Sequence, residues 1–235
     1  NAWEWEPRRR QYYYHSFLKE QPDLNYHNPA VREEMKKILH FWLDRGVDGF
    51  RLDTVNYFVH DEKLRDNPGK PPEAEWPPLN PYDMQLQKYS KSRPENVDWL
   101  KVIREITDQY ADRTLVGEVG DLDCAIPLMG EYTAGDDRLH MAYSFDMLSD
   151  IFTVAHFREV IEGFWKGAAD GWPMWSMSNH DVVRHVSRWA EYDAGDDRLA
   201  RLAAAMLLSF EGTICLYQGE ELGQTDTELT YDELT

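Results

Sequence analysis

Short apolar segments alternate with amphipathic helices along this chain, and this alternation is the feature that most restricts its fold. The segments that we expect to form strands cover residues 47–53, 114–118, 141–145, 173–178 and 213–217. The expected helices cover residues 28–45, 96–111, 156–169 and 197–210. Strands and helices that alternate in this way are typical of a parallel sheet with right-handed crossovers, so the sequence predicts an α/β fold.

The first expected helix has clear start and stop signals. Asn28 is a favourable N-cap residue and Pro29 suits the first helical position. Apolar residues then recur with a period of about 3.6 residues, which predicts one buried face. This face comprises Val31, Met35, Ile38, Leu39 and Trp42. Gly46 ends the helix at a position that favours a left-handed backbone.

Three of the expected strands lead to acidic residues. Asp53 closes the 47–53 strand, Glu118 closes the 114–118 strand, and Asp181 follows His180 just beyond residue 178. Because the carboxyl ends of parallel strands meet at one rim, this pattern predicts the mouth of a (β/α)8 TIM barrel with a carboxylate-lined pocket. A closed barrel needs eight strands and roughly 250 residues. We therefore expect a partial barrel, about strands 4 to 8 with their helices, that is a piece of a longer enzyme.

Two stretches fall outside the alternation. Residues 1–27 are rich in Trp and Tyr and show no lasting period, so we expect an ordered loop or small subdomain. Their aromatic side chains either pack under a loop or form a wall of a sugar pocket, where flat rings suit the apolar faces of pyranoses. Residues 60–96 contain seven of the twelve prolines, which predicts a long loop beside the mouth of the barrel.

Composition narrows the class of partner. A formal charge of −18 would repel the phosphates of nucleic acid, so we expect a neutral substrate. No apolar run approaches the ~18 residues of a membrane span, and we expect no membrane association. Cys124 and Cys215 indicate reduced thiols rather than a disulfide framework. The chain opens at Asn1 without a signal-peptide pattern, and a monomer in the cytoplasm is the expectation.

The acids at positions 53 and 118 suit glycoside hydrolysis. One carboxylate acts there as nucleophile and the other as acid and then base, and a separation of roughly 5–5.5 Å gives retention of configuration. Neighbouring parallel strands, about 4.8 Å apart, can supply that separation. Arg51 points to the same face as Asp53 and favours its ionised form, whereas the small neighbours of Glu118 favour a protonated acid. The alternatives are a strand-end ion pair, a structural glutamate and, at residues 179–181, a local turn.

Five segments together resemble the conserved regions of a known family. They are Gln21–Asn25, Gly49–Asp53, Val116–Val119, Asn179–Asp181 and Tyr217–Gly223. In this order they are similar to regions of the α-amylase family, glycoside hydrolase family 13. The last segment resembles the eighth-strand turn of the α-glucosidase and oligo-1,6-glucosidase branch, and the resemblance covers essentially the whole chain.

The resemblance implies a role for each matching residue. Asp53 matches the nucleophile, Glu118 matches the general acid/base, and Asp181 matches the acid that binds ring hydroxyls in the transition state. Arg51 and His180 match the substrate-binding positions that flank these acids. In this branch a hydroxylated residue after the nucleophile accompanies α-1,4 linkages, and that position is held by Thr54.

Further expectations concern the organisation of the chain and its ligands. Residues 1–27 resemble the end of a subdomain inserted after the third barrel strand, and residues 28–235 resemble part of the catalytic barrel. We also expect Phe145, at the end of the 141–145 strand, to contact the substrate. The implied chemistry requires no cofactor and no metal ligand among these residues. A structural calcium or other cation site would lie outside them.

We therefore expect a retaining α-glucosidase that hydrolyses, and also transfers, terminal non-reducing α-glucosyl residues of short maltose-like oligosaccharides through a covalent glucosyl-Asp53 intermediate. We expect α-1,4 linkages to be favoured over α-1,6. An oligo-1,6-glucosidase, a sucrose-acting enzyme and a glucosyltransferase are alternatives within the family. A non-catalytic barrel scaffold is disfavoured because all three acids are present. A metal-dependent hydrolase is disfavoured because the histidines are scattered.

Overall fold

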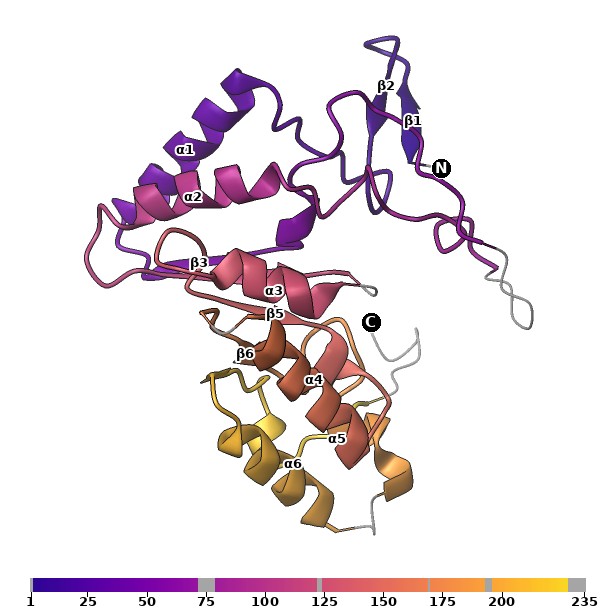
Figure 1. Cartoon of the computed structure of the whole chain (residues 1–235), viewed down its shortest axis with the longest axis vertical. Coiled ribbons are helices and arrows are strands. Elements are labelled where there is room, and N and C mark those ends of the chain that lie inside the picture. The colour runs from indigo at the N-terminus through magenta and orange to yellow at the C-terminus, as the bar shows by residue number, and fades with distance from the viewer. Residues whose placement is uncertain (1, 72–78, 122–123, 169, 193–195, 228–235) are drawn as a thin grey trace, which may run out of the picture. The chain divides into compact units, whose positions relative to one another are not determined.

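The computed structural model describes residues 2–71, 79–121, 124–168, 170–192 and 196–227 (Figure 1). The chain divides into two compact units, which comprise residues 1–118 and 119–235. Each unit has buried apolar side chains of its own. Among the helices in these described ranges, none is both long enough and apolar enough to cross a membrane.

A β-hairpin opens the first unit. β1 (Trp3–Glu6) pairs antiparallel with β2 (Gln11–Tyr14). Trp3 lies opposite Tyr14, and their ring centroids are 5.3 Å apart in an edge-on arrangement that stabilises the pair. Residues 3–14 are therefore ordered, although the sequence predicts no strand there. Strands of only four residues are too short for their alternation to stand out in the sequence.

Two helices of the first unit pack side by side (Figure 1). α1 (Pro29–Leu43) begins after Asn28, whose side chain accepts a hydrogen bond of 2.9 Å from the backbone N–H of Ala30. α2 spans Asn96–Thr107. The face of α2 that the apolar period predicts is buried, and it comprises Trp99, Leu100, Ile103 and Ile106.

The buried face of α1 differs from the predicted one. Leu39 and Leu43 are buried, whereas Ile38 and Trp42 are 43% and 47% exposed. Residues four apart lie on the same side of a helix, so Leu39 and Leu43 form one buried row. This row is displaced by one residue from Ile38 and Trp42, which the apolar period predicts to be buried.

Two parallel strands follow in this unit. β3 (Gly49–Leu52) pairs with β4 (Thr114–Val119), with Gly49 opposite Thr114 and Leu52 opposite Gly117. The backbones approach so closely at Gly49 that a β-carbon would lie 2.0 Å from the carbonyl oxygen of Thr114. This close approach requires glycine. Because of this register, the residue that follows Leu52 and the residue that follows Gly117 occupy matching positions on the two strands.

The connection from β3 to α2 is long. It begins with a 3₁₀ helix, η1 (Val55–Tyr57), and continues as the 60–96 loop, which ends where α2 starts. Gly69 and Gln85 form an isolated antiparallel bridge inside this loop. Between η1 and α2 the described residues form no helix or strand, which is what the prolines predict.

The second unit contains the remaining elements. They are α3 (Ala125–Thr133), β5 (Met141–Ser144), η2 (Asp146–Leu148), α4 (Val154–Gly167), β6 (Met174–Trp175), α5 (His185–Arg188), η3 (Ala190–Tyr192), α6 (Arg198–Ser209), β7 (Thr213–Ile214) and η4 (Glu220–Leu222). The sequence pattern predicts no helix between the strands expected at 114–118 and 141–145, yet α3 forms there. Pro127 and Gly130 mask it, because both residues are unfavourable inside most helices.

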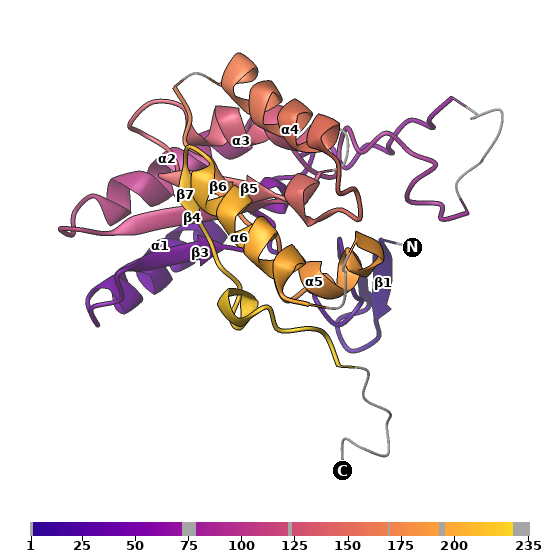
Figure 2. The ribbon, with the colours of Figure 1, turned by 90° about the horizontal axis from the view of Figure 1, so that it is seen from below.

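The strands of the second unit pair in parallel. β6 and β7 lie side by side, with Met174 opposite Thr213 (Figure 2). An isolated parallel bridge joins Ala142 of β5 to Pro173. The strands expected at 173–178 and 213–217 therefore exist, but each pairs over only two residues. Beside them the core is aromatic: Phe164 meets Trp175 edge-on at 5.9 Å.

Candidate active site

The ends of β3 and β4 bring two carboxylates to the same rim of the first unit. Leu52 pairs with Gly117, and the residues that follow these two are Asp53 and Glu118. Neighbouring parallel strands are about 4.8 Å apart, so side chains at matching positions can act on one small molecule. This is the placement that the strand-end acids predict for these two residues.

Arg51 contacts both acids. Its Nη1 donates to Oδ1 of Asp53, and its Nη2 lies 2.8 Å from Oε1 of Glu118. A guanidinium is a planar group with several fixed donors, which suits two carboxylates at once. Arg51 was predicted to pair with Asp53, but its contact with Glu118 was not. That contact joins residues far apart in sequence and depends on the register of two strands.

The two acids differ sharply in exposure. The side chain of Asp53 is 71% exposed, whereas that of Glu118 is only 2% exposed. Both oxygens of Glu118 are engaged, because Oε1 faces Arg51 and Oε2 accepts a 3.1 Å hydrogen bond from the backbone N–H of Thr54. Asp53 is therefore open to an incoming molecule. Glu118 would have to exchange one of these contacts to pass a proton to a substrate.

Thr54 contributes a strained backbone to the site. Its φ of 36° and ψ of 52° lie in the left-handed region, which β-branched residues rarely adopt. This conformation accompanies the hydrogen bond from its N–H to Glu118. Strain of this kind often occurs at functional sites, where the surrounding structure holds it in place. Thr54 was predicted as a substrate-binding residue, and the structure brings it to the acids through its backbone.

The third predicted acid belongs to the second unit, in the segment after β6. Asp181 accepts a 3.3 Å hydrogen bond from Nδ2 of Asn179, and its backbone N–H donates to Oδ1 of Asn179 at 2.9 Å. His180 Nε2 lies 3.5 Å from Oδ1 of Asp181. The side chains of His180 and Asp181 are 62% and 44% exposed, so both are open to a ligand. The local turn that was the alternative interpretation is present here as well.

Phe145 also lies in the second unit. It directly follows β5, is half-buried, and precedes the short helix η2. The convergence of Asp53, Glu118 and Asp181 on one basin stays a prediction, as does a contact between Phe145 and a substrate.

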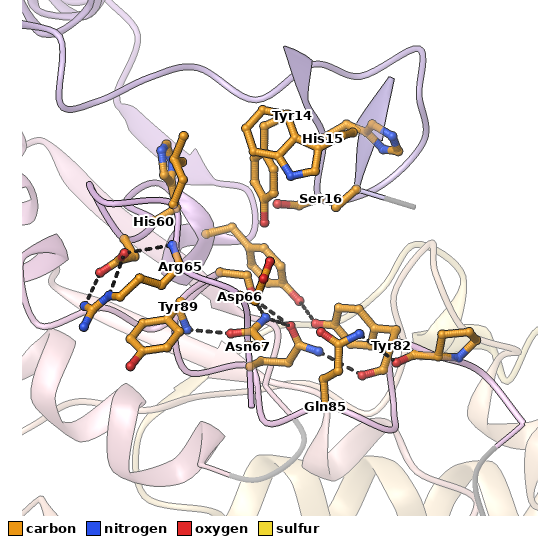
Figure 3. A pocket seen from close by; sticks show the side chains of 18 of the residues that line it. Tyr14, His15, Ser16, His60, Arg65, Asp66, Asn67, Tyr82, Gln85 and Tyr89 are labelled. Atoms are coloured by element: carbon orange, nitrogen blue, oxygen red, sulfur yellow. Dashed lines mark hydrogen bonds and ion pairs between the residues drawn. The ribbon is translucent and has the colours of Figure 1, made fainter. Parts of the chain in front are cut away.

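A cavity of about 500 Å3 lies in the first unit between the β1–β2 hairpin and the 60–96 loop (Figure 3). Small-molecule sites typically measure roughly 300–1,000 Å3. Its aromatic lining residues are Trp3, Tyr14, Phe17, Tyr57, Tyr82 and Tyr89. The N-terminal aromatic segment therefore forms part of a cavity wall, which is one of its two interpretations. That a sugar binds there stays a prediction.

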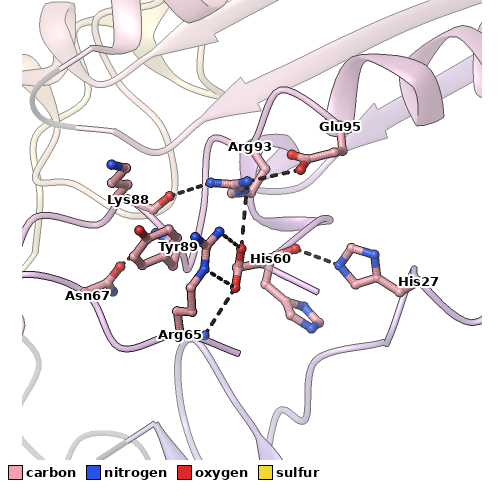
Figure 4. A network of polar contacts seen from close by, with 9 residues as sticks. His27, His60, Arg65, Asn67, Lys88, Tyr89, Arg93 and Glu95 are labelled. Atoms are coloured by element: carbon pink, nitrogen blue, oxygen red, sulfur yellow. Dashed lines mark hydrogen bonds and ion pairs between the residues drawn. The ribbon is translucent and has the colours of Figure 1, made fainter. Parts of the chain in front are cut away.

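Sequence reasoning missed a polar network beside this cavity (Figure 4). Asp61 is 3% exposed and pairs with Arg65, four residues later. Arg93 approaches the same carboxylate at 3.9 Å from the far end of the loop. The spacing of four residues between Asp61 and Arg65 was the one available signal, because the loop has no hydrophobic period.

The residues that the structure describes contain no group of three or more His, Cys, Asp or Glu side chains that could hold a metal ion. Cys124 and Cys215 form no disulfide with each other.

Comparison with known proteins gives a consistent set of relatives. A family model described as "Alpha amylase, catalytic domain" matches residues 1–235. A "Probable alpha-glucosidase" of Rhizobium meliloti (strain 1021) is 49% identical over 239 residues, which cover 100% of this chain and 43% of that protein. An "Oligo-1,6-glucosidase" of Halalkalibacterium halodurans is 31% identical over 240 residues, which cover 96% of this chain and 41% of that protein.

Solved structures agree with these relatives. An alpha-glucosyl transfer enzyme, XgtA, is 44% identical and superposes with a TM-score of 0.91, covering 100% of this chain and 44% of that one. The trehalose-6-phosphate hydrolase of Bacillus licheniformis is 28% identical with a TM-score of 0.76, covering 95% and 40%. The chain thus spans less than half the length of these relatives. The predicted fold class, a partial (β/α)8 barrel, is confirmed.

Proposed function

Because the chain belongs to the α-amylase family, glycoside hydrolase family 13, we propose that the protein containing it is a retaining α-glucosidase. It removes terminal non-reducing α-glucosyl residues from short maltose-like oligosaccharides. The observation that carries this proposal is the arrangement at the ends of β3 and β4. There Arg51 contacts both Asp53 and Glu118, one of them open to solvent and the other buried.

The reaction proceeds in two displacements. Asp53 attacks the anomeric carbon of the bound glucosyl unit while Glu118 donates a proton to the glycosidic oxygen. The carbon–oxygen bond breaks, and the leaving group departs as an alcohol. Water then attacks the anomeric carbon of the glucosyl ester, Glu118 accepts a proton from that water, and Asp53 is released as a carboxylate. The configuration at the anomeric carbon is retained because it is inverted twice.

Several side chains support these steps. Arg51 holds Asp53 in position, and a neighbouring guanidinium favours the charged carboxylate that a nucleophile requires. Glu118 takes part once the substrate replaces one of its contacts with Arg51 or Thr54. Asp181 binds ring hydroxyls as the sugar distorts, and His180 beside it donates to the same ring.

Further details of the proposal come from the sequence. Thr54 favours α-1,4 over α-1,6 linkages, and Phe145 contacts the substrate. Residues 1–27 are the end of a subdomain inserted before the barrel segment 28–235. The chemistry uses no cofactor. A monomeric state, a cytoplasmic location and a cation site outside this chain stay predictions.

Glucosyl transfer is a second candidate, favoured by one comparison. The solved structure that is 44% identical to this chain is named an alpha-glucosyl transfer enzyme. Transfer uses the same first displacement, and an acceptor hydroxyl replaces water in the second. Product analysis at high and low acceptor concentration separates hydrolysis from transfer.

The proposal is tested by replacing Asp53 with alanine in the full-length protein. Turnover of an aryl α-glucoside should fall by a factor on the order of 10⁴ or more, because no covalent intermediate can form. Asp48→Ala is the matched control, since it removes an exposed carboxylate just before the same strand. NMR of the wild-type reaction should show α-glucose as the first product. Near-wild-type turnover by Asp53→Ala, or β-glucose as the first product, would contradict the proposal.

A further inference from the structure

The 60–96 loop is fastened at its base by backbone and side-chain hydrogen bonds. The backbone N–H of Asp61 donates to the carbonyl of Tyr89 at 2.7 Å. The N–H of Ser92 donates to the carbonyl of Asn56 at 2.7 Å, and Nδ2 of Asn56 donates to Oγ of Ser92 at 3.0 Å. These contacts join the end of the loop, in residues 79–96, to its beginning at Asp61 and to Asn56 of η1, just before the loop. A long loop held in this way is restricted to few conformations and therefore presents a defined surface.

A cluster of charged side chains surrounds the buried Asp61 at the same base (Figure 4). The carboxylate of Asp61 accepts hydrogen bonds from Nε and Nη2 of Arg65, and Oδ2 also accepts from the Arg65 backbone N–H at 3.2 Å. Nη2 of Arg93 lies 3.9 Å from Oδ1 of Asp61 and 3.0 Å from Oε1 of Glu95. The hydrogen bonds from Arg65 hold the pKa of Asp61 well below its usual range. The two acids balance the two arginines, so the cluster is neutral as a whole.

Both arginines of the cluster approach the same tyrosine. The guanidinium carbon of Arg65 lies 4.2 Å from the ring centroid of Tyr89, and that of Arg93 lies 5.8 Å from it. The backbone N–H of Tyr89 also donates to Oδ1 of Asn67 at 2.8 Å. Tyr89 therefore packs against Arg65, which Asp61 binds directly. Its second cationic neighbour, Arg93, is bound at 3.0 Å by Glu95 and by the Lys88 carbonyl. The Tyr89 backbone is held by an amide from the other part of the loop.

Tyr89 and Arg65 form part of the cavity wall, together with Asn67 (Figure 3). Tyr57 lines the same cavity and is only four residues from Asp53. Four residues span at most about 14 Å, so the cavity begins no farther than that from the proposed nucleophile. Aromatic rings beside neutral amides suit a ring that carries hydroxyls, since its C–H face stacks and its hydroxyls bond to amides.

We propose that Asp61 is a positioning residue that holds Tyr89 and its neighbours in the cavity wall, and that this wall selects the group bonded to the transferred glucosyl unit. Asp61 does this through Arg65; it borders the cavity itself but is only 3% exposed, so the wall acts through Arg65 and Tyr89. The selected group is a neutral hydroxylated ring, either the sugar that leaves or the acceptor that arrives. This inference rests on the proposed function.

The test compares two substrates in the full-length protein. Maltose places a second sugar ring beyond the glucosyl unit, whereas α-glucosyl fluoride places only one atom there. Asp61→Asn removes the charge that orients Arg65 and keeps the shape of the side chain. We expect the KM for maltose to rise about tenfold or more, because small displacements of a binding wall have large effects. The kcat/KM for α-glucosyl fluoride should stay within about twofold of the wild type.

Two further variants make the comparison specific. Glu62→Gln removes a carboxylate from the adjacent exposed residue and should change neither substrate's kinetics. Arg65→Gln removes the other half of the pair and should reproduce the selective loss with maltose. The double variant Asp61→Asn/Arg65→Gln should be no worse than either single variant, because both act through one contact. The side chain of Arg65 is 48% exposed, so Arg65→Gln carries the test if Asp61→Asn does not fold.

The outcomes separate this inference from the proposed function. Equal losses with maltose and α-glucosyl fluoride would overturn it, since Asp61 would then act on the whole site. Wild-type kinetics of Asp61→Asn and Arg65→Gln with maltose would overturn it too. A wild-type protein that turns over neither substrate would instead refute the proposed function.

Discussion

Replacing Gly49 with alanine should separate β3 from β4 and impair the site without altering any proposed catalytic residue. The added β-carbon would lie 2.0 Å from the carbonyl oxygen of Thr114 and 2.8 Å from its carbonyl carbon. Both atoms belong to the backbone of β4, so no side-chain rotation relieves the clash. The two strands that deliver Asp53 and Glu118 must therefore move apart.

The size of the effect follows from these distances. Carbon and oxygen atoms that meet across strands are about 3.3–3.6 Å apart, so the backbones must separate by more than about 1 Å. The 3.0 Å hydrogen bond from the Thr114 N–H to the Asp48 carbonyl would then exceed the ordinary range. Overpacking costs about 1–3 kcal/mol and a lost hydrogen bond costs about 1 kcal/mol, which together lower the free energy of unfolding by roughly 2–4 kcal/mol.

Gly46→Ala is the matched control. Gly46 has a φ of +88°, and a β-carbon there would meet no atom within 4 Å. The substitution therefore costs only the left-handed backbone conformation, about 1–2 kcal/mol. Urea unfolding of the full-length protein measures both stabilities, and the kcat/KM for an aryl α-glucoside measures the site. Gly49→Ala should lower kcat/KM on the order of 10²-fold, because the two acids are displaced, whereas Gly46→Ala should leave it unchanged.

Two results would refute this reasoning. The first is an equal loss of stability in the two variants, because the clash with Thr114 would then contribute nothing. The second is a wild-type kcat/KM for Gly49→Ala, because the spacing of the two strands would then not set the geometry of the acids.

Three other predictions concern single residues. In Glu118→Gln, the first displacement should be spared with a good leaving group and the second slowed, so mass spectrometry should detect a glucosyl adduct on Asp53; a rapid burst without an adduct would contradict this. Burial and the neighbouring His27 hold the pKa of His60 below its ordinary value of 6.5. The unfolded chain therefore takes up a proton more readily, and urea midpoints should fall as pH drops below about 6.5, less steeply in His60→Gln. Burial raises the pKa of Tyr26 from 10.0 to about 12. Up to about 3 kcal/mol of stability should be lost as pH rises across that window, and Tyr26→Phe should not show this loss.

The sequence predicts the parts of the first unit that depend on local pattern. The cap at Asn28 and the period of the following residues predict α1, and the apolar run that ends at Asp53 predicts β3. Arg51 and Asp53 could be placed on one face because side chains two residues apart in a strand point to the same face of the sheet. The proximity of Glu118 could be predicted as well, since consecutive strands of such a fold are usually adjacent.

Other contacts could not be predicted because they join distant residues without a repeating pattern. The hydrogen bond from the Thr54 N–H to Glu118 needs both a register and a left-handed backbone, and neither is visible in composition. The cluster around Asp61 depends on how a proline-rich loop folds back on itself. α3 was missed because two unfavourable residues interrupt its nine positions. The lengths of β6 and β7 were overestimated because an apolar run indicates that a segment is buried but not how many of its residues pair with a neighbouring strand.

The arginine that contacts two acids has a consequence for how this site can change. If Asp53 is lost, Arg51 keeps Glu118 as an acidic partner, so the surroundings of the remaining acid also change. The losses of activity measured for single substitutions at these three positions will therefore not be additive, because Arg51 contacts both acids. A mutational library that varies these three residues one at a time should therefore yield mostly inactive variants. Any functional alternative at this rim should require coordinated substitutions.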